Sequence, residues 1–149
     1  MITIKNGDLL NATETIIAHQ VNCFGIAGGL GFHVFKKWHD AKNDYMQICN
    51  RIKKENLLGM AQLTGQQSDG HIIANLFGQF RPGADYNPKA IENALSALAK
   101  LAKSLKVDVA LPYKISCGIC GGDWEEVYAI IERTIQDVKF TIYKRACDN

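Results

Sequence analysis

Two glycine-rich loops carry the groups with which this sequence could hold phosphates. Four glycines fall between residues 25 and 31, and a second loop runs from Ser116 to Gly122. Each loop follows an apolar run typical of a buried strand and precedes a helical pattern. Such a strand, turn and helix start brings backbone N–H groups close to phosphate oxygens. Either loop alone could instead be a tight chain reversal, but two at one sheet edge could hold a diphosphate.

The first loop matches neither of two common nucleotide-binding motifs. No Gly-Lys-Ser or Gly-Lys-Thr follows it, so it is not a P-loop. Its glycine spacing also departs from the G-x-G-x-x-G dinucleotide fingerprint. Any nucleotide must therefore be held by another loop geometry.

Cysteine chemistry is the main rival to phosphate binding. Cys117 and Cys120 have C-x-x-C spacing just ahead of a helical pattern, where the pKa of a thiol can be depressed. Gly121 and Gly122 separate Cys120 from that helix, which weakens a redox interpretation. No second cysteine or histidine pair with zinc-ligand spacing follows, so we expect no metal. The chain has five cysteines, an odd number, so they cannot all pair with one another. Because the sequence also shows no secretory signal, we expect reduced thiols and a cytoplasmic location.

Strand-like and helix-like patterns alternate along the chain. A chain of 149 residues is most simply one domain, residues 1–149, and its net charge of +2 is too weak to indicate nucleic acid. The alternation predicts an α/β three-layer α/β/α sandwich around a mixed, mostly parallel sheet. We expect strands at 1–5, 16–21, 60–66, 71–77, 107–111 and 139–143, and helices at 29–38, 41–54, 88–105 and after Asp123.

The order of these patterns resembles the macrodomain family, which has an ADP-ribose-binding fold. The resemblance covers nearly the whole chain, and its branch is that of the ADP-ribose 1''-phosphate phosphatases and the terminal ADP-ribose protein glycohydrolases. It is carried by residues 7–10 with 17–23, the first glycine loop entering 32–38, residues 74–79, and residues 111–124.

The resemblance implies a binding role for residues along the whole pocket. Asp8 would receive the adenine amino group, Tyr143 would stack on adenine, and Asn22 would lie beside the distal ribose. The two loops would contact the distal ribose and the diphosphate. The implied contacts there are Leu9, Gly28, Gly29, Leu30, Gly31, Ser116, Cys117, Gly118, Ile119, Cys120 and Gly121.

Two departures bear on activity. The glycohydrolases of this branch use a lysine where this chain has Gln79, and an acidic residue where it has Cys120. Glutamine cannot form the covalent intermediate that a lysine forms, so that route is closed. In the phosphatase-like members, the residues that would orient water or phosphate correspond to His19, Cys23 and Asp123. Asp123 also suits a plain helix cap.

We therefore expect a monomeric, cytoplasmic protein that binds ADP-ribose, needs no cofactor and makes no membrane contact. The expected activity is hydrolysis at the distal ribose, with ADP-ribose 1''-phosphate as the first candidate substrate. Deacetylation of O-acetyl-ADP-ribose, or removal of ADP-ribose from a macromolecule, comes next. The alternatives are a non-catalytic ADP-ribose reader and the C-x-x-C redox protein.

Overall fold

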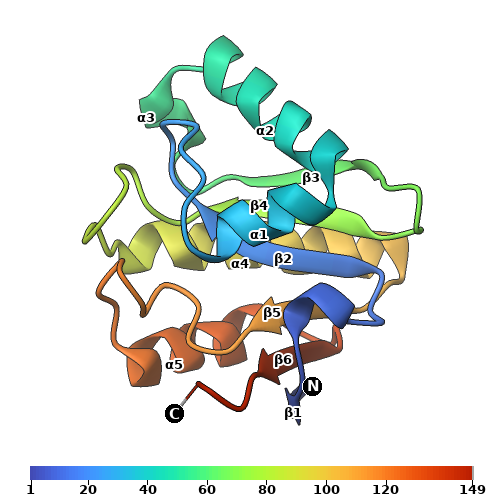
Figure 1. The fold of residues 1–149 in the computed structure, drawn as a ribbon. Helices are drawn as coiled ribbons and strands as arrows, with labels where there is room; N and C mark the ends of the chain where they lie inside the picture. The colour runs from blue at the N-terminus through green and yellow to red at the C-terminus, as the bar shows by residue number, and fades with distance from the viewer. Residues whose placement is uncertain (149) are drawn as a thin grey trace.

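One six-stranded sheet organises the chain (Figure 1). In the computed structural model, which describes residues 1–148, the strand order is β1-β6-β5-β2-β4-β3. All neighbouring strands are parallel except β3, which runs antiparallel to β4. The predicted mixed, mostly parallel sheet is confirmed. Its strands are β1 (Ile2–Asn6), β2 (Ile16–Val21), β3 (Ala61–Gln66), β4 (Ile72–Phe77), β5 (Val109–Pro112) and β6 (Phe140–Lys144).

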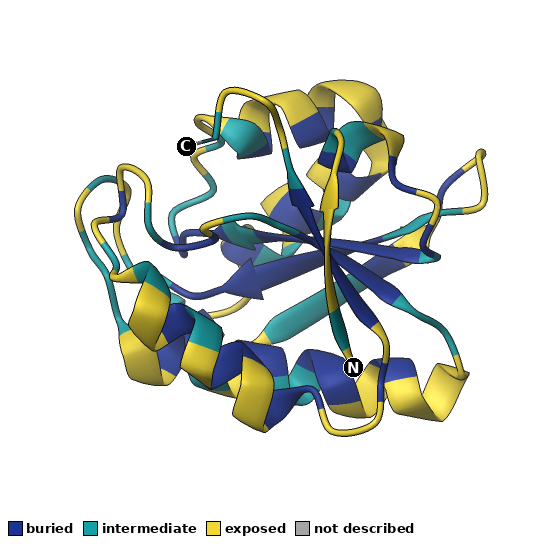
Figure 2. Ribbon diagram, turned by 90° about the horizontal axis from the view of Figure 1, so that it is seen from below, coloured by how far each residue is buried: buried dark blue, intermediate teal, exposed yellow. Residues whose placement is uncertain are grey.

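Helices cover both faces of the sheet, as the three-layer prediction requires. On one face lie α1 (Leu30–Lys37), α2 (His39–Arg51) and α3 (Lys54–Leu57), and on the other lie α4 (Pro88–Leu105) and α5 (Trp124–Thr134). A short 3-10 helix, η1, spans Leu9–Asn11. Figure 2 shows the helices buried along their inner sides and exposed along their outer sides, which is the pattern of amphipathic helices packed on a sheet.

The helix expected at 41–54 is two helices. The first begins at His39 and ends at Arg51, and Ile52 adopts an extended backbone. The chain then turns into α3, which carries Leu57 into the core, where it is fully buried. Burial of this leucine stabilises a break that helical periodicity alone did not predict.

Strand β2 is buried on both faces, as expected for a central parallel strand. Ile16 and Ala18 pack against the α4 and α5 layer, and Ile17 and Val21 pack against the α1 and α2 layer. The strand ends at the first glycine loop.

Local capping explains where two helices begin. Asn87 Oδ1 accepts from the Ala90 N–H (3.0 Å) at the start of α4, and Asp123 Oδ1 accepts from the Glu125 N–H (3.2 Å) at the start of α5. Both contacts lie within one helical turn, so the sequence predicted them correctly. Within residues 1–148, no helix has the length and apolar character that crossing a membrane would require.

Candidate functional site

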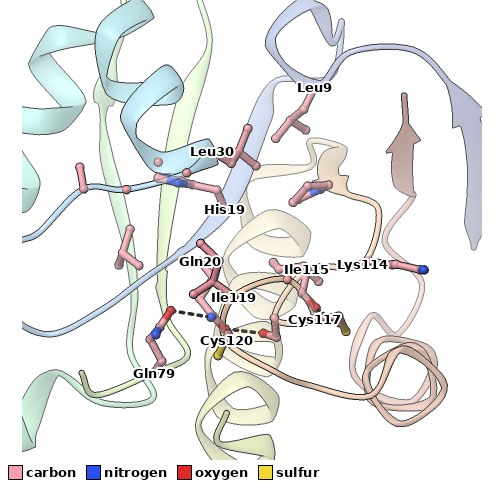
Figure 3. Close-up of a pocket in the computed structure, with 18 of the residues that line it drawn as sticks. Leu9, His19, Gln20, Leu30, Gln79, Lys114, Ile115, Cys117, Ile119 and Cys120 are labelled. Atoms are coloured by element: carbon pink, nitrogen blue, oxygen red, sulfur yellow. Dashed lines mark hydrogen bonds between the residues drawn. The ribbon is translucent and has the colours of Figure 1, made fainter. Parts of the chain in front are cut away.

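A cavity of about 760 Å³ opens beside the carboxyl ends of β2, β5 and β6 (Figure 3). Ligand sites in open α/β sheets lie at these strand ends. Both glycine loops line the cavity, so the structure brings together segments that lie about ninety residues apart. Of the binding residues that the resemblance implied, those at the cavity are Asp8, Leu9, Asn22, residues 28–31, residues 116–120 and Tyr143. Gly121 is the exception.

The first loop is shaped by Asn22. Its Oδ1 accepts from the N–H groups of Phe24 (2.9 Å) and Ile26 (3.4 Å), and its Nδ2 donates to the Ile26 carbonyl (2.8 Å). The Tyr45 hydroxyl donates to the Asn22 carbonyl (2.7 Å) from α2. Asn22 therefore lies at the pocket as implied, but its amide is engaged in holding the loop.

Both loops present backbone donors without protein acceptors. Within the described residues, the N–H groups of residues 28–30 and 118–120 make no hydrogen bond to the protein. Residues 28–30 also stand at the start of α1, whose N-terminal end has no side-chain cap. Unpaired N–H groups at a helix start carry partial positive charge and attract phosphate.

The second loop is held in a backbone shape that few residues adopt. Lys114 and Ser116 both have positive φ, +58° and +70°, although neither is glycine. The Gly122 N–H donates to the Ser116 carbonyl (2.9 Å) and closes the loop. Left-handed backbone at non-glycine residues persists only where the surroundings enforce it, and it is concentrated at ligand sites. Alternating backbone handedness also turns successive N–H groups toward one point.

A hydrogen-bonded brace runs from the second glycine loop through Gln20 on β2 to the segment that follows β4, and the dashed lines of Figure 3 mark the bonds made by Gln20. Ser116 Oγ donates to Gln20 Oε1, and Gln20 Nε2 donates to Gln79 Oε1 (3.0 Å). Gln79 Nε2 donates to the carbonyls of Arg81 (2.7 Å) and Gly83 (3.2 Å). Both polar atoms of the Gln79 side chain are thus engaged in this brace. The resemblance drew attention to Gln79, but the sequence did not predict this brace or the part that Gln20 plays in it.

His19 is the one predicted catalytic candidate that the structure places at the pocket, beside Leu30 (Figure 3). Its Nε2 lies 2.7 Å from Asn75 Oδ1, and the edge of its ring packs against Phe35. Its Nδ1 is buried and has no partner among the described residues. Burial lowers the pKa of His19 from 6.5 to about 4, and the contact with Asn75 opposes that shift only in part. His19 is therefore neutral at pH 7.

Cys23 and Asp123 do not line the cavity. Cys23 is fully buried, with Sγ 3.5 Å from the Gln79 carbonyl, and burial raises the pKa of its thiol to about 12. Asp123 caps α5. Neither side chain is part of the cavity lining, so their catalytic roles stay predictions that the geometry of the cavity does not support.

The C-x-x-C cysteines lack the property that redox chemistry needs. Burial, reinforced by the charge of Asp123, raises the pKa of Cys117 to about 11, and burial also raises the pKa of Cys120. A reactive thiol needs the opposite shift. All five cysteines are unpaired thiols. Within residues 1–148, no cluster of three His, Cys, Asp or Glu side chains could hold a metal ion.

Asp8 and Tyr143 also line the cavity. Asp8 Oδ1 accepts from the Leu10 N–H (2.9 Å) and so caps η1, and the other carboxylate oxygen makes no protein hydrogen bond within residues 1–148. The Tyr143 hydroxyl donates to Glu14 Oε1 (2.6 Å), which fixes the ring in the wall. A ligand can therefore meet one carboxylate oxygen and one anchored aromatic ring here.

Comparison with known proteins places this geometry in a family. No protein-family model matches the chain. A protein of Lodderomyces elongisporus named ADP-ribose 1''-phosphate phosphatase is 29% identical to it, over 95% of this chain and 98% of its own length. The macrodomain of Mycobacterium tuberculosis DarG is 29% identical, with a TM-score of 0.83 over 96% of this chain and 97% of the other. A macrodomain protein from Streptomyces coelicolor is 25% identical, with a TM-score of 0.78 over 97% and 99%. With this sheet order, a pocket between two glycine loops and similarity over nearly its whole length, the chain has the macrodomain fold.

Proposed function

We propose that this macrodomain binds ADP-ribose and hydrolyses ADP-ribose 1''-phosphate to ADP-ribose and phosphate. One observation carries the proposal. Two sets of unpaired backbone N–H groups and a neutral histidine with an unpartnered nitrogen line the same cavity. The name of the Lodderomyces relative, which aligns end to end with this chain, supports the same reaction.

The geometry suits each part of that ligand. The free carboxylate oxygen of Asp8 accepts from the adenine amino group, against the ring of Tyr143. The amides of the two loops neutralise the diphosphate, which preorganised donors do without reorganisation. The distal ribose then lies beneath the first loop, near His19.

The chemical step needs one water. The water attacks the phosphorus and the bond from phosphorus to O1'' breaks. The proton that the water gives up to His19 passes to O1'', so the products are ADP-ribose and phosphate. His19, neutral at pH 7, accepts a proton from the attacking water through its free ring nitrogen. The loops hold the substrate in place, so much of the rate enhancement comes from positioning.

A non-catalytic reader is the second candidate function. The brace around Gln79 favours it, because that side chain occupies the lysine position of the glycohydrolases and has no free polar atom. A reader would bind ADP-ribose with the same loops and would leave the ligand intact.

Phosphate release separates the two functions. Purified protein is given saturating ADP-ribose 1''-phosphate, and free phosphate is measured over many turnovers. The proposal expects continuous release, and calorimetry should show ADP-ribose binding much more tightly than ADP or AMP. Tight binding without phosphate release would establish the reader. O-acetyl-ADP-ribose and an ADP-ribosylated macromolecule are the next substrates to try.

Replacing Asp8 tests the adenine end. Asp8→Asn keeps an oxygen for the Leu10 N–H but removes the charge, so we expect ADP-ribose binding to weaken by about 1–3 kcal/mol while η1 stays capped. Calorimetry measures this, with AMP as a second ligand that should suffer equally. An affinity equal to that of the wild type would show that adenine does not contact Asp8.

We further propose that the protein acts as a monomer in the cytoplasm. The five unpaired thiols support a reducing compartment. Sedimentation of the purified protein and fractionation of cells test the two statements separately.

A further inference from the structure

A chain of side-chain amides leads to the buried ring of His19. Asn75, on β4, is completely buried, and its Oδ1 lies 2.7 Å from His19 Nε2. Asn75 Nδ2 lies 3.0 Å from Oε1 of Gln62, on the neighbouring strand β3. Gln62 Nε2 in turn lies 3.0 Å from the backbone carbonyl of Asp44, on α2. The chain thus runs from a backbone group of one helix to the wall of the pocket.

The last link decides the direction of every hydrogen bond in this chain. A backbone carbonyl can only accept, so Gln62 must turn its NH2 group toward Asp44. Its oxygen then faces Asn75, which must present its own NH2 group there. The oxygen of Asn75 consequently faces His19, and the partner of an oxygen acceptor is a donor. His19 therefore carries its proton on Nε2, and Nδ1 holds a lone pair.

We propose that Asn75 and Gln62 are positioning residues that hold His19 in the tautomer with the proton on Nε2, so that its Nδ1 faces the ligand as an acceptor. This rests on the proposed function for its catalytic meaning. It also goes beyond that function, because it specifies which kind of ligand group can hydrogen-bond to His19. Only a hydrogen-bond donor satisfies Nδ1, so the group that meets it is a water or a ribose hydroxyl, and not a phosphate oxygen.

The surroundings of Nδ1 agree with this assignment. Nδ1 is the single buried side-chain polar atom without a partner in residues 1–148. Gly31, in the first turn of α1, lies directly against it, since a Cβ built on Gly31 would stand 3.8 Å from Nδ1. The unsatisfied acceptor therefore lies beneath the loop that the resemblance assigns to the distal ribose. Leaving such an atom unpaired costs free energy, which a donor brought by the ligand would recover.

Nuclear magnetic resonance reads the tautomer directly. Long-range ¹H–¹⁵N correlation on ¹⁵N-labelled protein distinguishes protonated from unprotonated ring nitrogens, and a His19→Gln sample identifies the His19 signals among the four histidines. We expect a protonated Nε2 and an unprotonated Nδ1 in the wild type. A proton on Nδ1 would overturn the proposal, whether or not the protein hydrolyses anything.

Variants of the chain test its effect on catalysis. Gln62→Leu breaks the chain at the half-buried strand β3, and we expect a mixture of His19 tautomers and a kcat at least about tenfold lower, within the range of a misplaced base. The dissociation constant of ADP-ribose should change less than about threefold, since the loop amides remain. Gln66→Leu, the same substitution on the same strand outside the chain, should behave as the wild type. Wild-type kcat in Gln62→Leu, or an equal loss in Gln66→Leu, would contradict the proposal.

Asn75 itself offers a rescue test. Asn75→Leu removes the acceptor and should allow the proton to move to Nδ1, with loss of turnover. Asn75→Asp combined with Gln62→Leu keeps an oxygen facing Nε2 and removes the Gln62 oxygen that the second carboxylate oxygen would otherwise oppose, so it should restore the tautomer and most of the kcat. Equal loss in both variants would overturn the positioning role. If turnover is absent even in the wild type, the enzyme proposal fails, while the tautomer measurement still decides this inference.

Discussion

Replacing His19 by alanine should lower the turnover of ADP-ribose 1''-phosphate by about 10²–10⁴-fold, the usual contribution of a general base. Binding of ADP-ribose should change much less, because the loop amides and Asp8 do not contact this ring. Initial rates of phosphate release and calorimetry with ADP-ribose measure the two quantities on the same sample. His19→Gln is the matched control, since its amide can still donate to Asn75 and fill most of the space.

Both His19 variants should lose turnover, and only His19→Ala should also lose stability through the cavity that it leaves. A kcat that survives in His19→Gln would show that His19 serves packing and not proton transfer. Retained phosphate release in both variants would remove His19 from the mechanism.

The low pKa of His19 also predicts how kcat depends on pH. With a pKa of about 4, the ring stays neutral from pH 5.5 upward, so protonation of His19 should not reduce kcat between about pH 5.5 and 8. A fall centred near the ordinary histidine value of 6.5 would contradict the burial seen here.

The same shift affects folding. The unfolded chain binds a proton at His19 below pH 6.5 and the folded chain does not until about pH 4. The free energy of unfolding therefore falls as the pH drops from 6.5 towards 4. His19→Gln should lose that part of the slope in denaturant titrations at several pH values.

Gly122→Ala should damage the second loop more than any other single methyl group placed in it. A Cβ at Gly122 would lie 2.6 Å from the Ser116 carbonyl oxygen and 2.8 Å from the ring of Tyr86. The backbone must move to relieve this, which costs about 1–3 kcal/mol. Because the Gly122 N–H closes the loop on Ser116, the amides of residues 118–120 move as well. We expect ADP-ribose to bind about tenfold or more weakly.

Gly118→Ala is the control for Gly122→Ala within the same loop. No atom lies within 4 Å of a Cβ built there, so thermal unfolding should stay near that of the wild type. Gly122→Ala should lower Tm by about 2–4 °C for each kcal/mol. Equal Tm values and equal affinity in the two variants would show that Gly122 is not held against Ser116.

The motifs of this chain were visible in sequence because their signals are local. A continuous apolar run marked β2 as a buried strand, and Asn87 and Asp123 capped helices through contacts two or three residues away. Two glycine loops, each between a strand and a helix, predicted where the sheet would bind a ligand. For the same reason the end of α2 was predicted wrongly. The periodic pattern continued past Arg51, but burial of Leu57 ended the helix.

The predicted catalytic residues also show what the sequence could not decide. The sequence already favoured a helix cap for Asp123, but it did not separate His19 from Cys23, and only the structure placed His19 in the lining of the cavity and Cys23 outside it. Cys23 follows the strand closely, yet its side chain turns into the core, because direction along a strand end depends on packing. The C-x-x-C spacing left open a lowered thiol pKa, which Gly121 and Gly122 already argued against, and burial raises the pKa of both thiols.

By itself the sequence determined the order of strands and helices and the two loops, since these depend on periodicity and on residues close together along the chain. Only the tertiary structure decided what the polar side chains do. The contact of His19 with Asn75 joins residues 56 positions apart, and the contact of Ser116 with Gln20 joins residues 96 positions apart. No local pattern encodes such pairs, because they form only when the packed sheet brings its strand ends to one edge and burial leaves each polar atom to find a partner there.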